Sequence, residues 1–185
     1  ILISYLLKNK NNIYVLAKLI NNPKLYKKKK FHLRVLFIHT IINTKHYSYI
    51  YKISGLASAK KDYNMNILSS DVIDTHFNSS PYKDVYMDIS KYKTEIIELF
   101  KHIHNLLKHN KVKSYNNNDG YEILGADIII TDDNMIQLLE VNDRIGFSIY
   151  NNKYMINLLN NIFDITIDKI FNKDTKINNN FIKII

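Results

Sequence analysis

The sequence predicts an α+β fold: a mainly antiparallel sheet with flanking helices. Runs of β-branched and aromatic residues alternate with short polar turns at 31–53 and 121–142, which is typical of hairpins. Apolar residues recur at helical spacing at 96–107 and 154–162. The chain has 185 residues, 46% of them hydrophobic, so it can bury one core, and a single domain is the default expectation.

The first half of the chain is expected to hold strands and loops. A strand is predicted at 14–20. A hairpin follows, with strands at 31–42 and 47–53 joined by the polar residues 43–46. Residues 54–90 are mixed and rich in Ser, Asp and Asn, so we expect a long loop with short elements there.

The clearest helix in the sequence ends near His109. Asp88 or Ser90 can cap its start, and its apolar positions are Ile96, Phe100, Ile103 and Leu107. Its histidines at 102, 104 and 109 lack the i, i+4 spacing of a metal motif, so we expect them on the surface. A second helix is predicted around 154–162, and the Lys/Asn-rich tail from 171 is expected to be poorly ordered.

The most informative stretch is the hairpin at 121–142. If Thr131 to Asn134 form a four-residue turn, Ile130 pairs with Met135 and Asp127 lies opposite Leu138. Side chains alternate between the two faces of a strand, so Asp127, Glu140 and Asn142 share one face. The other face is the expected core face and carries Leu124, Ala126, Ile128, Ile130, Met135, Gln137, Leu139 and Val141.

The shared face of this hairpin has the composition of a metal site. Asp127 and Glu140 are predicted to be diagonal neighbours, with backbones roughly 7–8 Å apart. Two carboxylates that approach in partly apolar surroundings repel each other unless a cation lies between them, and oxygen ligands suit magnesium. From the pattern alone, half-exposed acids without a function explain the face equally well.

Composition narrows the classes of function. The chain has no cysteine, which excludes disulfides, thiolate metal sites and thiol nucleophiles, and is compatible with a cytoplasmic location. The net charge of +9 indicates an acidic partner: a nucleotide, a nucleic acid or an acidic protein tail. The longest lysine run, 27–30, has no interleaved aromatic platform, which argues against specific nucleic-acid binding. No apolar stretch approaches the roughly 20 residues that cross a membrane.

Two segments resemble a known family. The hairpin segments 121–127 and 138–142 are similar to the last nucleotide-binding segment of tubulin-tyrosine ligase-like proteins, which belong to the ATP-grasp superfamily. Upstream, Lys30 to Val35 resembles that family's Lys-Phe-Asp-Leu-Arg segment, and 20–23 stands in the place of its hinge Tyr-Ile-x-x-Pro. Weaker similarity at 55–63 and 76–79 extends the resemblance over most of the chain, from Tyr14 to Leu159.

The resemblance implies the C-terminal part of an ATP-grasp domain with ATP-dependent carboxylate–amine ligase activity. Such an enzyme phosphorylates a carboxylate of an acidic protein acceptor, such as a tubulin tail, and a free amino acid then displaces the phosphate. It also implies a cytoplasmic location, with association with the cytoskeleton as one option. On this basis 1–22 would end the preceding subdomain and its hinge, 23–170 would be the C-terminal subdomain, and 171–185 would be a tail.

The resemblance also implies roles for individual residues. Arg34 and Glu140 are the expected catalytic residues, and Lys30 and Arg34 would contact the nucleotide from one strand face. The backbone of Lys18, Leu19 and Ile20 would meet the adenine of ATP. Magnesium would be held by Asp127, Glu140 and Asn142.

The sequence departs from the family pattern at several positions. His32 replaces the acid of the Lys-Phe-Asp-Leu-Arg segment, and Ala17, Ala57 and Ser79 replace polar or charged residues. We therefore also consider a pseudoenzyme or binding module for acidic protein tails, and a basic nucleic-acid-binding domain as the weakest alternative. Because the family's preceding subdomain is not in the sequence, we expect residues 1–185 alone to have little ligase activity and a longer parent protein to carry it.

Overall fold

The computed structural model describes residues 19–67, 69–76, 80, 85–109, 119–143, 145, 152–171 and 179–185. The strands are β1 Leu25–Tyr26, β2 Lys29–Ile42, β3 Lys45–Tyr51, β4 Ile53–Ser58, β5 Tyr86–Asp88, β6 Gly120–Ile130, β7 Ile136–Asn142 and β8 Phe181–Lys183. The helices are α2 Ser70–Ile73, the 3-10 helix η2 Ser90–Tyr92, α3 Lys93–His109, α4 Asn152–Ile165 and α5 Ile167–Phe171. The α+β class that the sequence predicts is confirmed.

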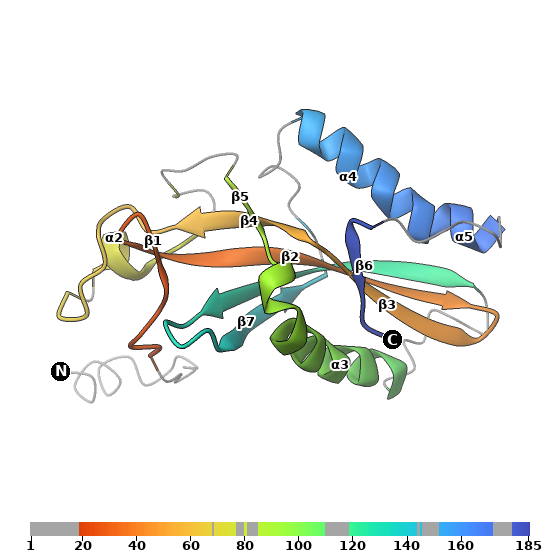
Figure 1. The fold of residues 1–185 in the computed structure, drawn as a ribbon, viewed down its shortest axis with the longest axis horizontal. Coiled ribbons are helices and arrows are strands. Elements are labelled where there is room, and N and C mark those ends of the chain that lie inside the picture. The colour runs from red at the N-terminus through yellow and green to blue at the C-terminus, as the bar shows by residue number, and fades with distance from the viewer. Residues whose placement is uncertain are drawn as a thin grey trace, which may run out of the picture.

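One sheet organises the described part of the chain, with the long strand β2 at its centre (Figure 1). Strand β6 pairs with one edge of β2, and β3 and β4 share the other edge. The sheet is extended by β7 beyond β6, by β5 beyond β4 and by β8 beyond β3. Every pairing between described strands is antiparallel, as predicted.

The β2–β3 hairpin forms where the sequence predicts it, with a tighter turn. Only Asn43 and Thr44 lie between the paired strands, and their φ angles are 50° and 65°. Two consecutive positive φ angles are the type I′ geometry, whose twist matches that of a two-residue hairpin. Lys45 and His46 therefore belong to β3 rather than to the turn.

Strand β4 lies almost wholly in the range 54–90, where the sequence predicts a long loop with short elements and no particular strand. Its Gly55 and Ala57 have low strand propensity, so the sequence shows no β-branched run there. The strand forms because it pairs with residues 31–34 of β2, where Leu56 and Ala57 become buried. Long-range pairing therefore overrides local propensity at this position.

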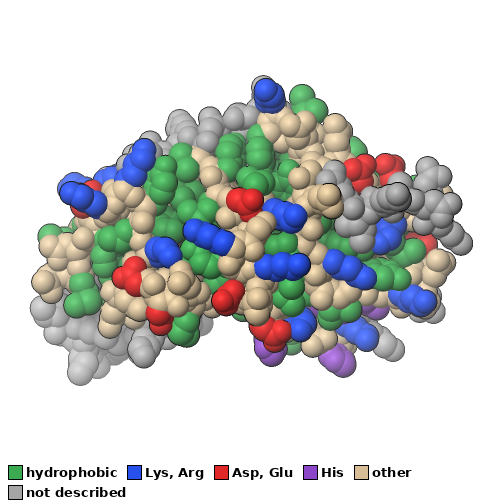
Figure 2. All heavy atoms as spheres, viewed as in Figure 1, with side chains coloured by type: hydrophobic (Ala, Val, Ile, Leu, Met, Phe, Trp, Pro, Cys, Tyr) green, Lys and Arg blue, Asp and Glu red, His purple; other side chains and the backbone are tan. Residues whose placement is uncertain are grey.

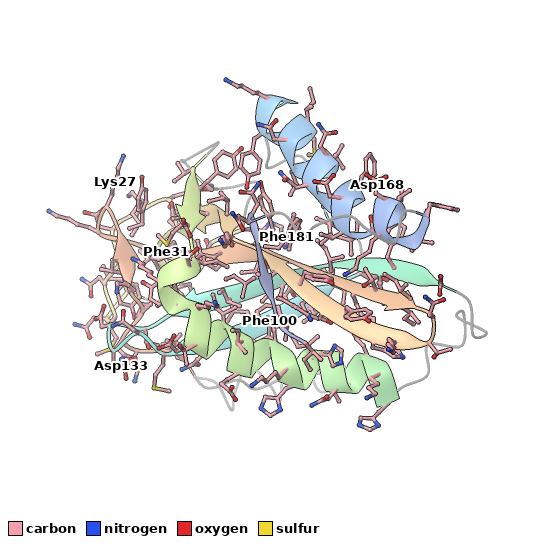
Figure 3. All side chains as sticks on the ribbon, turned by 45° about the vertical axis from the view of Figure 1, so that its right-hand side comes forward. Lys27, Phe31, Phe100, Asp133, Asp168 and Phe181 are labelled. Atoms are coloured by element: carbon pink, nitrogen blue, oxygen red, sulfur yellow. The ribbon has the colours of Figure 1, made fainter. Side chains whose placement is uncertain are left out.

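Helices cover both faces of the sheet (Figure 1). On one face α3 packs against alternate residues of β2, including Phe31, and Figure 3 shows Phe100 where α3 lies against the strands. On the other face α4 packs against Leu36 and Ile38 of β2. The helix residues buried in these two layers are Ile96, Phe100, Ile103, Leu158, Ile162 and Ile165. Both predicted helices are confirmed.

The C-terminal segment is more ordered than expected. Residues 181–183 form β8 and pair with β3, and Phe181 and Ile182 are buried. The expectation of a poorly ordered tail is therefore wrong for this strand, because its apolar residues complete the core on both faces of the sheet. Residues 172–178 lie outside the described part of the chain.

His104 is buried, although the sequence analysis expected all three helix histidines on the surface. Its side chain is 2% exposed, and its Nδ1 lies 2.8 Å from Oγ of Ser48. His104 follows Phe100 by four residues and so lies on the buried stripe of α3. His102 and His109 are exposed, as predicted. Within the described ranges, no helix has the length and apolar character needed to cross a membrane.

Candidate functional site

Three charged side chains lie in a row across the central strands. Arg34 of β2 is paired in register with Asp127 of β6, and Asp127 is paired with Glu140 of β7. Directly paired residues of antiparallel strands project to the same face. Leu36 projects to this face as well and is covered by α4, so the row lies just beyond the part of the sheet that α4 covers.

The β6–β7 register differs from the predicted one in two places. The connection between the paired strands is one residue longer than expected: Ile130 pairs with Ile136 instead of Met135, so residues 131–135 lie between them, and Asn134 adopts a φ of 64°. A β-bulge follows between Asp127 and Ile128 and leaves Leu139 as the extra residue of β7. Each one-residue shift in register turns the side chains of β7 to the opposite face of the sheet. Two such shifts cancel, so Glu140 lies on the predicted face.

The consequences for β7 can be stated residue by residue. The predicted shared face of Asp127, Glu140 and Asn142 agrees with the observed register, but Asp127 lies directly opposite Glu140, not on a diagonal. Residues 136–138 lie between the two shifts, so their side chains point to the face opposite to the predicted one. Ile136 therefore packs on the core, contrary to expectation. The predicted core residues Met135, Leu139 and Val141 are instead 56%, 49% and 40% exposed.

Arg34 and Asp127 form a buried, bidentate ion pair. Arg34 Nε donates to Asp127 Oδ1 at 2.7 Å, and Arg34 Nη2 donates to Oδ2 at 2.6 Å. The two side chains are 13% and 7% exposed. A guanidinium that matches both oxygens of a carboxylate is a strong and geometrically specific arrangement. The charge of Asp127 is therefore compensated within the protein.

Gly125 leaves the space that the Arg34 side chain uses. A Cβ at position 125 would lie 3.4 Å from Arg34 Cδ, and 3.6 Å from both Arg34 Nε and Ile145 Cγ1. A Cβ there would make ordinary van der Waals contacts, so Arg34 lies close beside β6 at Gly125, two residues before Asp127 on the same strand.

His32 adds a neutral imidazole next to the ion pair. Its Nδ1 lies 2.7 Å from Thr75 Oγ1, and its Nε2 lies 3.7 Å from Asp127 Oδ2. Burial lowers the pKa of His32 to about 4; Asp127 acts in the opposite direction and Arg34 in the same one. The imidazole is therefore uncharged at neutral pH, where the family pattern has a carboxylate.

These side chains line one pocket of about 240 Å³. Its lining consists of His32, Arg34, Asp74, Thr75, His76, Asp127, Leu139 and Glu140. Three carboxylates and one guanidinium give the lining a formal charge of −2 when the histidines are neutral. Small-molecule sites typically measure roughly 300–1,000 Å³, so this pocket has room for a polyphosphate and its cation rather than for a whole nucleotide.

The donor set fits a cation that arrives with phosphate groups. No group of three or more His, Asp or Glu side chains in the described ranges is arranged to hold a metal by itself. Magnesium on a nucleotide needs only one or two protein carboxylates. Glu140 is exposed and accepts a hydrogen bond from Asn142 Nδ2 at 3.0 Å, and each Asp127 oxygen keeps an acceptor site beyond its bond to Arg34.

The other predicted nucleotide contacts lie away from this pocket. Lys30 shares the β2 face of Arg34 but lies about 13 Å along the strand and does not line the pocket. Its burial lowers its pKa. Leu19 and Ile20 lie in no strand, and Leu19 is 41% exposed. Lys18, together with most of the strand predicted at 14–20, lies outside the described residues, as do Ala17 and Ser79.

Sequence reasoning missed Asp74 and Thr75 as pocket residues. They follow the short helix α2, and the Asp74 Oδ1 accepts a hydrogen bond from the backbone N–H of His76 at 2.8 Å. This bond closes a turn within the loop, and the contact between Thr75 Oγ1 and His32 Nδ1 joins the loop to β2. Residues 74–76 are polar, as are many loop residues of this chain. Only the tertiary contact of Thr75 with His32 of β2 shows that they belong to the site.

No protein-family model and no curated protein matches this chain.

Proposed function

We propose that the chain is the phosphate- and metal-binding part of an ATP-dependent carboxylate–amine ligase of the tubulin-tyrosine ligase-like type, in the C-terminal part of an ATP-grasp domain. One observation carries the proposal. Arg34, Asp127 and Glu140, singled out by two family-like motifs, line the same pocket. Arg34 and Asp127 are 93 residues apart in the chain, so their convergence does not follow from local sequence.

The proposed reaction has two steps. A carboxylate oxygen of an acidic protein acceptor attacks the γ-phosphorus of ATP, and ADP leaves. The amino group of a free amino acid then attacks the acyl phosphate and phosphate leaves, which forms an amide bond. Magnesium, when bound, supplies positive charge between the phosphates. Asp127, Glu140 and Asn142 would hold it, and the Arg34 guanidinium would stabilise negative charge on the transferring group.

Nucleotide binding by the chain is expected to require magnesium. The pocket lining has a formal charge of −2, so it repels a bare polyphosphate and accepts one whose charge a cation has reduced. We expect ATP with magnesium to raise the melting temperature of the 185-residue chain, and ATP with EDTA to leave it unchanged. Differential scanning fluorimetry and isothermal titration calorimetry measure both effects.

Glu140→Gln tests the site directly, because Glu140 is exposed and its replacement is not expected to disturb the fold. Loss of this carboxylate is expected to weaken Mg-ATP binding by about tenfold or more. Asp132→Asn is the matched control: Asp132 is an exposed acid in the turn of the same hairpin and does not line the pocket. Equal affinities of Glu140→Gln and the wild type would remove Glu140 from the proposed site.

A second candidate is a binding module for acidic protein tails. One observation favours this candidate. His32 on β2 lies directly opposite Ala57 on β4, so two positions at which the sequence departs from the family pattern are neighbours in the sheet. Figure 2 shows Lys and Arg side chains spread among acidic and apolar ones on the visible face, which suits a diffuse attraction to an acidic chain. Salt-sensitive binding of polyglutamate without any binding of Mg-ATP would support this candidate and contradict the ligase.

A further inference from the structure

Strand β7 has one edge that no described strand covers. Its inner edge pairs with β6, and it has no other strand partner within the described ranges (Figure 1). In an antiparallel pair, every second residue directs its N–H and C=O away from the partner strand. The outer edge of β7 therefore presents a row of backbone donors and acceptors, which can pair with a further strand.

Apolar side chains lie exposed along this edge. Leu138 and Val141 are 36% and 40% exposed. Their partners on β6, Ile128 and Ala126, belong to the core that α3 covers, so both side chains project to that face of the sheet. Natural proteins often protect an edge strand with lysine or proline, but the only charged residue of β7 is Glu140. An apolar row therefore continues the core surface out to the open edge.

The hairpin that carries this edge is acidic, although the whole chain has a net charge of +9. Residues 131–143 include four exposed acids and neither Lys nor Arg: Asp132, Asp133, Glu140 and Asp143. Figure 3 shows Asp133 at the turn of the hairpin. In the described part of the chain none of the four is ion-paired, and nearby Lys24 donates to Asn134 Oδ1 at 2.7 Å instead. The edge therefore attracts a cationic strand.

We propose that the outer edge of β7 binds an extended segment of a partner protein in which apolar residues alternate with Lys or Arg. The segment adds a strand to the sheet through backbone hydrogen bonds. Because side chains alternate between the two faces of a strand, its apolar residues cover Leu138 and Val141 on the α3 side. Its cations lie on the opposite face, which is the face of Glu140. This binding goes beyond the proposed ligase function and requires no nucleotide.

Charge argues against a second copy of the chain as the occupant. Two copies of β7 that pair antiparallel about Leu138 bring Asp133 of each copy near Asp143 of the other. Like charges directly opposite each other destabilise a strand pair. The same repulsion disfavours an acidic tail at this edge, so the occupant is a basic segment.

The test uses the 185-residue chain and a fluorescent peptide of about eight residues that alternates valine and lysine, which is long enough to span the seven residues of β7. Fluorescence anisotropy measures binding, and hydrogen exchange locates it. We expect saturable binding and slower amide exchange within 136–142. A valine–glutamate peptide should bind about tenfold more weakly or less, because its charges are repelled. The valine–lysine peptide with methylated backbone nitrogens should lose binding by a similar factor, because it cannot donate to the edge.

Val141→Lys tests the edge in the protein itself. It removes an apolar contact and adds a cation at the edge, so the affinity for the valine–lysine peptide should fall by about tenfold or more. Ile156→Lys is the matched control: it adds the same charge at a side chain that is 61% exposed on α4, over the other face of the sheet, and should bind as the wild type does. Urea denaturation verifies that both variants fold.

Three results would overturn the inference. The first is equal affinity of Val141→Lys and Ile156→Lys for the peptide. The second is equal binding of the valine–lysine peptide and either of its two control peptides by the wild type. The third is slower exchange within 136–142 that rises with chain concentration in the absence of peptide, which would assign the edge to a second copy. No nucleotide is present in these measurements, so their outcome is independent of the proposed ligase function.

Discussion

Asp127→Asn is expected to lower the free energy of unfolding by about 3–5 kcal/mol, because it leaves the buried Arg34 charge without its counterion. The side chains of the pair are only 13% and 7% exposed, so water replaces the lost partner poorly. Urea denaturation at neutral pH measures the change as a shift of the midpoint with an unchanged slope. A loss below about 1 kcal/mol, the value of an exposed pair, would contradict the buried geometry.

Two further variants separate the charge from the fold. Asp132→Asn removes an exposed acid of the same hairpin and should cost little. Arg34→Met combined with Asp127→Leu removes both charges together, and should recover much of the loss, since apolar pairs of similar size often replace buried ion pairs without cost. The loss of stability also affects the functional test. In an Asp127 variant, weaker nucleotide binding combines the effect of unfolding with the loss of an expected magnesium ligand, so Glu140 is the cleaner probe of the site.

Acidification from pH 7.5 to 5 is expected to destabilise the fold through the buried histidines between β2, β3 and α3. His39 is 4% exposed; its Nδ1 lies 2.9 Å from Ser48 Oγ and its Nε2 lies 3.0 Å from His46 Nδ1. Burial and, to a smaller extent, the neighbouring His104 and His46 lower the pKa of His39 from 6.5 to about 4. The pKa values of His104 and His46 are also lowered, in both cases first by burial, and nearby Lys108 contributes to each.

The sign of the effect follows from proton counting. Below pH 6.5 the unfolded chain binds protons on these histidines that the folded chain does not, so stability is fully present above pH 6.5 and is lost as the pH falls towards 4. The shift of His39 alone corresponds to at most about 3 kcal/mol. Urea denaturation at several pH values should show this slope, and His39→Gln should flatten it.

His102→Gln serves as the control for the acid effect. His102 is an exposed histidine on α3, two residues before buried His104, so its replacement should leave the pH dependence unchanged. Equal unfolding free energies for the wild type at pH 7.5 and 5 would show that the cluster is protonated in the folded state. The predicted mechanism would then be wrong, whatever the behaviour of the variants.

Hydrophobic periodicity was sufficient to predict the elements with a strong local pattern. The β2–β3 hairpin, α3 and α4 were predicted because β-branched runs and a 3.6-residue apolar repeat reflect the packing of each element on one core. The sequence left β4 unassigned among the short elements expected in a long loop and placed β8 in a poorly ordered tail. Both strands depend on long-range pairing: Gly55 and Ala57 are poor strand formers, and β8 is three residues long. Their stability comes from partners that the local sequence does not show.

The candidate site shows the same division. Period-two alternation was sufficient to place Asp127, Glu140 and Asn142 on one strand face, and the β6–β7 register agrees. It could not predict that Asp127 lies directly opposite Glu140, because Leu139 forms a bulge whose position depends on the neighbouring strands. Nor could it predict that Arg34 pairs with Asp127, since this depends on the register of two strands 93 residues apart.

The sequence by itself determined the α+β class, the central hairpins, the two long helices and the strand face that carries the acids of the pocket. These properties follow from short-range patterns of side-chain size and polarity, which act within a single element. Only the tertiary structure decided that Arg34 neutralises Asp127, that His32 joins Thr75 to this pair, and that His104 is buried beside His39 and Ser48. Those properties depend on which elements become neighbours, and pairing across the sheet sets this through contacts distant in sequence.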